Sequence, residues 1–183
     1  MLKTNTPWKT LSSKYVYENP WLKVRHDEVM KPDGTKGIYG VIEGRNYNMI
    51  IPKIGNQFFL VEQFRYTTSR MSIEFPGGAI EPNETIDAAA ARELHEETGL
   101  LGGRLTHLGF LHEGNGHENF GFHEYIAEDC IEGNQQLESS EHDMTIKKCS
   151  FEEVKQLIQD GKMTDGPSVA SFALYLLHEK NFG

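Results

Sequence analysis

The chain has 183 residues, of which 38% are hydrophobic and 25% are charged, and its formal net charge is −9. This length fits one domain with room for an appended subdomain, and the composition is that of an ordinary globular protein. The acidic balance argues against non-specific nucleic-acid binding, which needs a basic face, but it is compatible with a phosphate-bearing small molecule held by local arginines and metal ions.

Neither a membrane segment nor a disulfide framework is indicated. No apolar run approaches the ~20 residues that span a bilayer, and the first ten residues, MLKTNTPWKT, lack the apolar core of a signal peptide. Cys130 and Cys149 have no short metal or redox spacing, which favours a reducing compartment, with a disulfide between them as the minor alternative. We therefore expect a cytoplasmic protein with no membrane partner.

The N-terminal part is typical of an antiparallel β-hairpin. Residues 21–31 alternate like a strand, Pro32-Asp33-Gly34 provides a turn, and residues 36–43 form the returning strand. Because a two-stranded hairpin is marginal in water, it must pack on the rest of the chain or on a second copy. We expect a β-strand subdomain at 1–44 and a main domain at 45–183.

The rest of the chain mixes strands with a few separated helices. Glycines and prolines crowd residues 75–82, and an alanine-rich stretch from about 84 to 98 predicts a helix that ends at Gly99. The helix at 167–179 is expected to have Pro167 at its first position. This order favours an α+β or α/β/α sandwich fold. The remaining elements are strands at 47–51, 57–64, 104–112, 120–127 and 144–149, and a helix at 151–160.

Three carboxylates share one face of the predicted 84–98 helix. Glu93, Glu96 and Glu97 stand at i, i+3 and i+4. Like charges at this spacing repel by a few tenths of a kcal/mol per pair. Because a divalent cation would convert that repulsion into binding, the pattern predicts a metal site.

Residues 78–100, GAIEPNETIDAAAARELHEETGL, match the Nudix box without a departure. The resemblance implies a loop–helix–loop in an α/β/α sandwich, which binds magnesium, with manganese as the alternative, and hydrolyses a diphosphate that joins a nucleoside to another group. Such a cation would neutralise the diphosphate and lower the pKa of an attacking water. The matching residues are Gly78, Glu84, Arg92, Glu93, Leu94, Glu96, Glu97, Gly99 and Leu100.

The resemblance also assigns roles within the box. Arg92 is expected to pair with Glu84 or Glu96 and fix their geometry, the alternative being a surface salt bridge of little value. We therefore count Arg92 and Glu96 as catalytic candidates, and Glu84 as a less direct participant. The expected metal ligands are oxygen donors, namely the carbonyl of Gly77 and the carboxylates of Glu93, Glu96 and Glu97.

Upstream of the box, Gln63-Phe64-Arg65 and residues 73–78, IEFPGG, resemble the ADP-ribose and nucleotide-sugar pyrophosphatase branch of this family. The similarity extends over most of the chain, including the N-terminal hairpin. It implies that Arg65 binds a phosphate, for which a guanidinium is well suited, and Glu74 belongs to the same substrate-binding arrangement. The alternative for Arg65 is a salt bridge at a strand end.

This branch also builds homodimers whose N-terminal strands exchange and hold the base between aromatic rings. Trp21 and Tyr39 lie on either side of the hairpin turn, where such rings are expected, although most aromatic side chains serve core or interface packing. Stacking requires only a flat π face and tolerates several bases. We therefore expect a homodimer formed through the N-terminal strands.

One departure concerns the substrate. Enzymes of the branch that are selective for ADP-ribose carry a proline about sixteen residues after the box, whereas this chain has Glu113-Gly114-Asn115-Gly116-His117 there. A broader nucleoside diphosphate sugar hydrolase, accepting for example GDP-mannose or ADP-ribose, therefore fits better. His117, Asn119 and His123 are candidates for sugar or phosphate contacts, the alternative being structural or solvated side chains.

The general base in this branch is a glutamate in a loop after the box. The polar stretch 135–142 is the corresponding place here, with Glu141 as the expected base and Glu138 as the alternative. Two other functions stay open. One is a Nudix hydrolase of dinucleoside polyphosphates or capped RNA, which the acidic balance disfavours. The other is a catalytically silent nucleotide sensor, against which the complete set of box glutamates argues.

Overall fold

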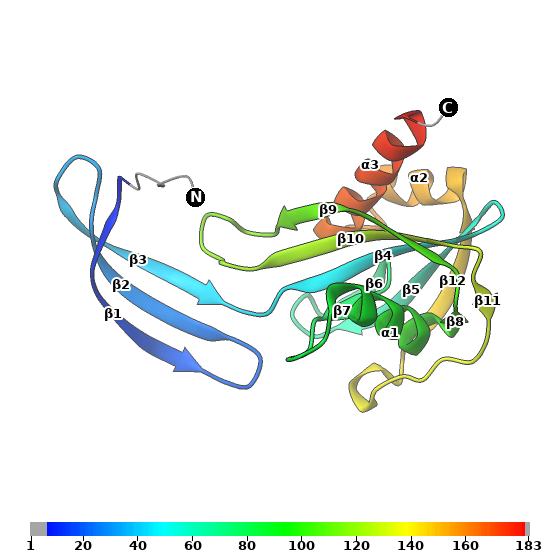
Figure 1. Ribbon diagram of the computed structural model, residues 1–183, viewed down its shortest axis with the longest axis horizontal. Coiled ribbons are helices and arrows are strands. Elements are labelled where there is room, and N and C mark those ends of the chain that lie inside the picture. Colours follow the sequence, from blue (N-terminus) through cyan, green and yellow to red (C-terminus); the bar gives the residue numbers. More distant parts are fainter. Residues whose placement is uncertain (1–6, 182–183) are drawn as a thin grey trace. The chain divides into compact units, whose positions relative to one another are not determined.

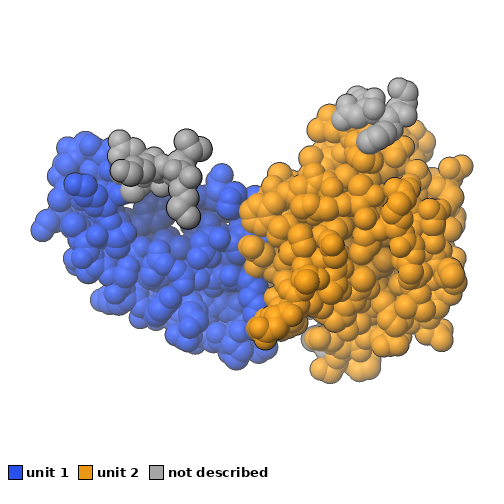
Figure 2. Space-filling model, in the orientation of Figure 1, with its two compact units in different colours: residues 1–45, 112–121 blue, residues 46–111, 122–183 orange. Residues whose placement is uncertain are grey.

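The computed structural model describes residues 7–181, which form two compact units (Figure 2). Within the described residues, the first unit takes residues 7–45 and 112–121, and the second takes 46–111 and 122–181. The predicted subdomain at 1–44 did not include the segment 112–121. Of the first ten residues, which lack the apolar core of a signal peptide, residues 1–6 lie outside the described part of the chain. No helix within residues 7–181 is long and apolar enough to cross a membrane.

The first unit is a three-stranded antiparallel sheet in the order β1-β2-β3. The predicted hairpin is confirmed as β2 (Lys23–Met30) and β3 (Lys36–Glu43), joined by a turn in which Gly34 has φ 80°. A third strand, β1 (Lys9–Glu18), is an addition to the prediction. All ten of its residues are exposed, so it lacks the alternation of buried and exposed side chains that marks a half-buried strand.

A network of charges joins the three strands of this sheet. Asp27 on β2 is only 3% exposed, accepts hydrogen bonds from the Arg25 guanidinium and also pairs with the Ser13 hydroxyl on β1. Arg25 in turn pairs with Glu43 on β3. The Arg25 hydrogen bonds hold the pKa of Asp27 below its ordinary value. The segment 112–121 joins the same unit, because Ile42 and His117 share a backbone hydrogen bond of 2.7 Å.

The main sheet has the order β12-β5-β4-β10-β9, with β6 paired to β5 and β7 paired to β4. β4 and β10 are parallel, whereas β5 is antiparallel to β4, β6 and β12. A separate two-stranded sheet joins β8 (Leu100–Leu101) to β11 (Ile131–Glu132). The strands of the main sheet are β4 (Tyr47–Ile54), β5 (Gln57–Arg65), β6 (Arg70–Glu74), β7 (Gly77–Ala79), β9 (Arg104–His112), β10 (Gly121–Glu128) and β12 (Thr145–Ser150).

Helices cover both faces of this sheet, which confirms the α/β/α sandwich (Figure 1). The helix α1 (Ile86–Thr98) packs through Ala90 and Leu94 against a core that contains Ile50 of β4. The neighbouring strand residues Met49 and Ile51 belong to a second core with α2 (Phe151–Gln159) and α3 (Gly166–Asn181). Successive residues of β4 therefore serve opposite faces, as expected for a central strand.

The strands predicted at 47–51, 57–64, 104–112, 120–127 and 144–149 are confirmed with ends within three residues, as are the predicted helices. α3 begins at Gly166, so Pro167 is its second residue and not its first. The sequence missed the short elements β6, β7, β8 and β11 and the 3₁₀ turn at Ser139–Glu141. Most of these pieces are too short to show a hydrophobic period, and only their pairing with longer strands defines them.

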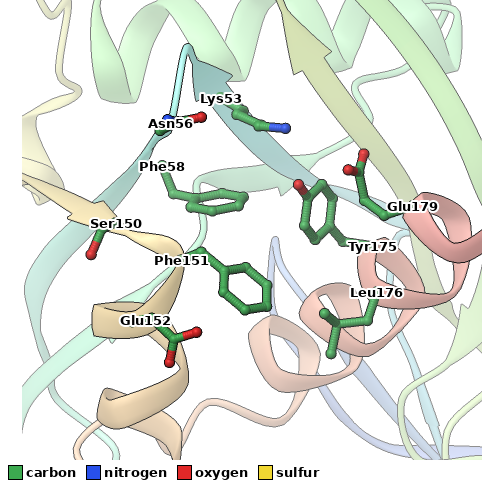
Figure 3. A pocket seen from close by; sticks show the side chains of 9 residues that line it. All are labelled: Lys53, Asn56, Phe58, Ser150, Phe151, Glu152, Tyr175, Leu176 and Glu179. Atoms are coloured by element: carbon green, nitrogen blue, oxygen red, sulfur yellow. The ribbon is translucent and has the colours of Figure 1, made fainter. Parts of the chain in front are cut away.

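A cavity of about 530 Å³ lies on the α2 and α3 side of the sandwich (Figure 3). Its walls include Phe58, Phe151 and Tyr175, and the ammonium of Lys53 lies 5.5 Å from the centroid of the Tyr175 ring. The face of the sheet that carries α1 is the opposite one. The cavity is therefore separate from the box carboxylates.

Candidate active site

The helix α1 carries the box carboxylates. A side chain caps its N-terminus, and a backbone N–H caps its C-terminus. The hydroxyl of Thr85 accepts a hydrogen bond from the Ala88 N–H at 3.2 Å at the start of the helix. At its end Gly99 adopts the left-handed conformation with φ 71°, and its N–H donates to the His95 carbonyl at 2.8 Å. A glycine is favoured there because other residues reach this conformation only with strain.

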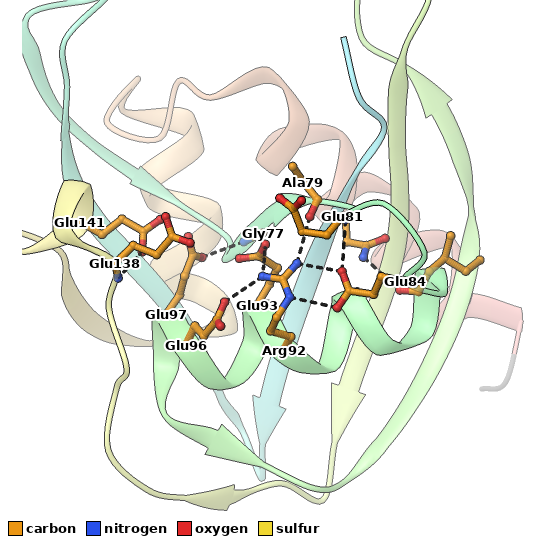
Figure 4. Close-up of polar contacts among 12 residues, drawn as sticks. Gly77, Ala79, Glu81, Glu84, Arg92, Glu93, Glu96, Glu97, Glu138 and Glu141 are labelled. Atoms are coloured by element: carbon orange, nitrogen blue, oxygen red, sulfur yellow. Dashed lines mark hydrogen bonds and ion pairs between the residues drawn. The ribbon is translucent and has the colours of Figure 1, made fainter. Parts of the chain in front are cut away.

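Arg92 is the centre of a network that gathers three carboxylates (Figure 4). Its guanidinium donates two hydrogen bonds of 3.0 Å to Glu84, and bonds of 2.8 Å to both Glu93 and Glu96. A further bond of 3.0 Å reaches the carbonyl of Ala79 in β7. We expected Arg92 to pair with Glu84 or Glu96, and in the structure it pairs with both. It also ties the helix to the preceding strand.

The network holds more negative charge than one arginine balances. Burial raises the pKa of Glu93 to about 7, although Arg92 opposes this shift. Burial also raises the pKa of Glu97 well above its ordinary value, although Glu97 accepts a hydrogen bond from the Gly77 N–H at 2.8 Å. The charge of Glu93 raises the pKa of Glu97 further, and the charge of Glu96 does the same to the pKa of Glu93, as expected for buried like charges.

The two glycines of the preceding strand let the backbone approach these carboxylates. A Cβ at Gly78 would overlap the carboxylate of Glu93, and a Cβ at Gly77 would overlap the backbone carbonyl of Asn48 on β4. Gly77 therefore needs to be glycine for space, whereas a side chain at Gly78 would require the Glu93 carboxylate to move; neither glycine has a positive φ.

The donor set fits a hard divalent cation in its chemistry. Among the described residues, no three His, Cys, Asp or Glu side chains are already arranged to hold a metal ion; Arg92 and the Gly77 N–H hydrogen-bond to the box carboxylates. The same residues offer buried carboxylate oxygens with surplus negative charge beside a backbone that leaves room for them. The ligand roles of Gly77, Glu93, Glu96 and Glu97 stay predictions.

The loop that carries Glu141 lies against the end of the box helix. The Gln136 N–H donates to the Glu96 carbonyl at 2.9 Å, and the Gln135 amide donates to the Glu97 carbonyl at 2.5 Å. These carbonyls belong to the last turn of α1, where no further helical N–H is available. The loop is thereby fixed to the element that presents the box carboxylates.

Glu141 is close enough to the box for its charge to raise the pKa of both Glu93 and Glu97. Its own carboxylate accepts a hydrogen bond from the Glu138 N–H at 3.3 Å, in a reciprocal cap of the short 3₁₀ turn. Glu141 is half-buried, whereas Glu138 is exposed. The structure thus brings both candidate bases to the box, with Glu141 the more enclosed of the two (Figure 4).

Two positioning residues were missed by the sequence reading. Asp143 accepts a hydrogen bond from the Phe64 N–H at 2.9 Å and so anchors the Glu141 loop to the end of β5. The buried hydroxyl of Ser168 on α3 accepts one from the Phe75 N–H at 2.9 Å and so holds the segment that precedes Gly77. Neither residue lies in a motif, and the only available signal was an Asp or Ser beside a strand or helix end.

Arg65 is bound to Glu74 across the β5–β6 pair. Its Nε donates to one carboxylate oxygen of Glu74 at 2.9 Å and its Nη2 pairs with the other, while Glu74 itself is only 4% exposed. The negative charges of Asp165 and Glu97 also act on the Arg65 guanidinium, which places it beside the box. The alternative of a salt bridge is therefore realised, and it orients an arginine that still exposes 47% of its side chain.

The aromatic candidates belong to the first unit. Trp21 lies in the β1–β2 connection and is 79% exposed. Tyr39 opposes Asp27 in the β2–β3 register, packs edge-on against Trp8 at 5.7 Å between ring centroids, and donates to the Gly116 carbonyl at 2.6 Å. Trp21 lies before Lys23, and the strand from Lys23 to Asp27, the residue opposite Tyr39, is already ~13 Å long. Within one chain Trp21 and Tyr39 therefore do not face each other, and their joint role stays a prediction for an assembly.

The other candidates of the segment after the box are divided between the units. His117 lies 3.5 Å from a carboxylate oxygen of Glu118, and the Asn119 N–H donates to the Ile42 carbonyl at 3.2 Å, both in the first unit. His123 lies on β10 in the second unit, where its Nδ1 is 3.2 Å from Nε2 of His107. The role of each of these residues in sugar or phosphate binding stays a prediction.

Two family models match the chain. Residues 8–42 match the nucleoside diphosphate sugar hydrolase N-terminal domain, and residues 45–172 match the NUDIX domain. The second match covers more than half of the chain and includes the carboxylate network around Arg92.

Individual relatives agree with these matches. An ADP-ribose pyrophosphatase of Bacillus subtilis (strain 168) is 21% identical over 174 residues, covering 93% of this chain and 94% of its own. An ADP-sugar pyrophosphatase of Mus musculus is 32% identical over 112 residues, covering 54% of this chain and 51% of its own. A crystal structure of an ADP compounds hydrolase superposes with a TM-score of 0.87 at 20% identity, covering 96% of both chains, and so supports the fold.

Proposed function

The chain belongs to the Nudix family of hydrolases, and from this membership we propose that it hydrolyses the diphosphate bond of nucleoside diphosphate sugars. ADP-ribose and GDP-mannose are the expected examples, and the products are a nucleoside monophosphate and a sugar phosphate. The N-terminal match to a nucleoside diphosphate sugar hydrolase domain supports this substrate class. The observation that carries the proposal is the surplus of buried carboxylates around Arg92, with Glu141 beside them.

Nudix hydrolases generally need a divalent metal, and we propose magnesium, with manganese as the alternative, held by Glu93, Glu96, Glu97 and the Gly77 carbonyl. When bound, such a cation neutralises the diphosphate and increases the acidity of an attacking water. Arg92 keeps Glu84, Glu93 and Glu96 in place, and it compensates part of their charge. Space for the Glu93 carboxylate depends on Gly78.

The remaining steps fall to residues outside the helix. Glu141 would accept a proton from the attacking water, since it is half-buried and near Glu93 and Glu97. Arg65 would bind a phosphate oxygen of the substrate, with Glu74 orienting its guanidinium in a fixed plane. In this proposal Glu141 serves proton transfer and Arg65 serves phosphate binding.

For the N-terminal sheet we propose a role in homodimerisation and base recognition in a cytoplasmic enzyme. Large apolar side chains are exposed on it, with Trp21 at 79% and Ile38 at 71% exposed area. A sheet that presents such side chains to water is typical of an interaction surface. In a dimer, Trp21 and Tyr39 could come from different chains and stack on one base.

The test uses the purified chain with magnesium and a panel of ADP-ribose, GDP-mannose, dinucleoside polyphosphates and capped RNA. The expected result is equal release of nucleoside monophosphate and sugar phosphate, lost in Glu97→Gln and retained in the matched surface variant Glu132→Gln. Cleavage confined to dinucleoside polyphosphates or capped RNA would replace the proposed substrate class. Tight nucleotide-sugar binding without turnover would support a sensor and overturn the proposed reaction.

A further inference from the structure

Two histidines that are not part of the carboxylate network meet on the main sheet. His107 of β9 and His123 of β10 lie on neighbouring strands, with His107 Nε2 3.2 Å from His123 Nδ1 and the ring centroids 5.3 Å apart. Neither residue belongs to the box. His107 is exposed and His123 is half-buried, so the pair is accessible from solvent.

The separation of the two nitrogens fits the edge of a metal coordination tetrahedron. Zinc binds imidazole nitrogen at ~2.0–2.1 Å, and two such ligands on a tetrahedral ion are then roughly 3.3 Å apart. The observed 3.2 Å between His107 Nε2 and His123 Nδ1 matches this separation. Without a metal, the same distance is satisfied when one neutral ring donates its N–H to the other.

Neighbouring side chains hold both rings. The Tyr125 ring lies 4.9 Å from the His107 ring, and the Phe110 ring lies 4.9 Å from the His123 ring, measured between centroids. Tyr125 is itself held by a 2.5 Å hydrogen bond from its hydroxyl to Asp87 in the first turn of α1. Burial, and then the nearby His107, lower the pKa of His123, which favours the neutral form that ligates metals.

We propose that His107 and His123 form a two-imidazole binding site for a borderline transition-metal cation, with Zn²⁺ as the expected ion. In the described part of the chain no third His, Cys, Asp or Glu completes the set, so water or a small anion fills the other positions. Imidazole selects Zn²⁺ and Cu²⁺, whereas the carboxylates of α1 select Mg²⁺. The two sites therefore differ in metal preference, and binding here would link β9 to β10.

The test is calorimetric titration of the chain with ZnCl₂ in the presence of saturating magnesium, which occupies the carboxylate network. We expect one zinc equivalent that magnesium does not displace. His107→Gln and His123→Gln should each weaken zinc binding by more than about tenfold, since each removes one of two protein ligands. His26→Gln, on the separate N-terminal sheet, serves as the matched control and should bind as the unmodified chain does.

Histidine NMR provides a readout that does not depend on a variant folding correctly. On adding zinc to the unmodified chain with magnesium present, the ring signals of two of the eight histidines should shift together. Unchanged affinity in both variants, or displacement of the zinc by magnesium, would overturn the site. Either result leaves the proposed hydrolysis untouched, because that is measured with magnesium alone.

Discussion

Replacing Arg92 tests whether the box is held together by one guanidinium. In Arg92→Ala, Glu84, Glu93 and Glu96 lose their shared cation, although the last two stand within one helical turn of each other. The Arg92 side chain is 29% exposed, so solvent replaces only part of the lost interaction. Breaking a buried ion pair from one side costs 3–5 kcal/mol, and allowing for this exposure we expect a loss of about 3 kcal/mol in the free energy of unfolding.

The matched control is Arg104→Ala. Arg104 is 62% exposed and pairs with one carboxylate, that of Glu128, at 2.7 Å. A surface pair of this kind contributes less than about 1 kcal/mol. The two variants thus remove the same side chain from settings that differ in burial and in the number of carboxylates.

Urea unfolding followed by far-UV circular dichroism is the appropriate assay. The three α-helices found in residues 7–181 all lie in the unit that contains Arg92, whereas both tryptophans, Trp8 and Trp21, lie in the N-terminal unit and would report on that sheet. A chelator must be present, so that a resident metal does not replace the lost positive charge. If Arg92→Ala and Arg104→Ala lost equal stability, the central role of Arg92 would be refuted.

Three further outcomes are expected. Glu141→Gln should lower kcat by ~10²–10⁴ through loss of the proposed base, with Glu138→Gln as control; equal steady-state rates in the two variants would remove that assignment. Gly78→Ala should lose most activity while keeping its far-UV spectrum, because the methyl group overlaps the Glu93 carboxylate, and full activity would contradict this packing. Glu124 is fully buried, and burial raises its pKa to about 7. The free energy of unfolding therefore falls, by up to about 3 kcal/mol, as the pH rises from the pKa of Glu124 in the unfolded chain through 7. Glu124→Gln should therefore gain stability over the native chain between about pH 5 and about pH 8 in urea unfolding, and a pH-independent difference would argue against a protonated Glu124.

The regular elements were largely predictable because their signals are local. The helix at 86–98 has a threonine cap, an alanine-rich body and a terminal glycine, and each of these acts within a few residues. β1 escaped prediction because all of its residues are exposed, so no hydrophobic period marks it. The segment 112–121 joined the N-terminal unit through hydrogen bonds to Ile42, a contact that no local pattern encodes.

The sequence by itself determined which carboxylates of the box share one face, since Arg92, Glu93, Glu96 and Glu97 lie within two turns of one helix and helical periodicity alone places them there. Only the tertiary structure decided the rest. Glu141 approaches the box because Gln135 and Gln136 bind the last carbonyls of α1. Burial, a property of the whole fold, sets the raised pKa values of Glu93 and Glu97, and the meeting of His107 with His123 depends on the pairing of two strands.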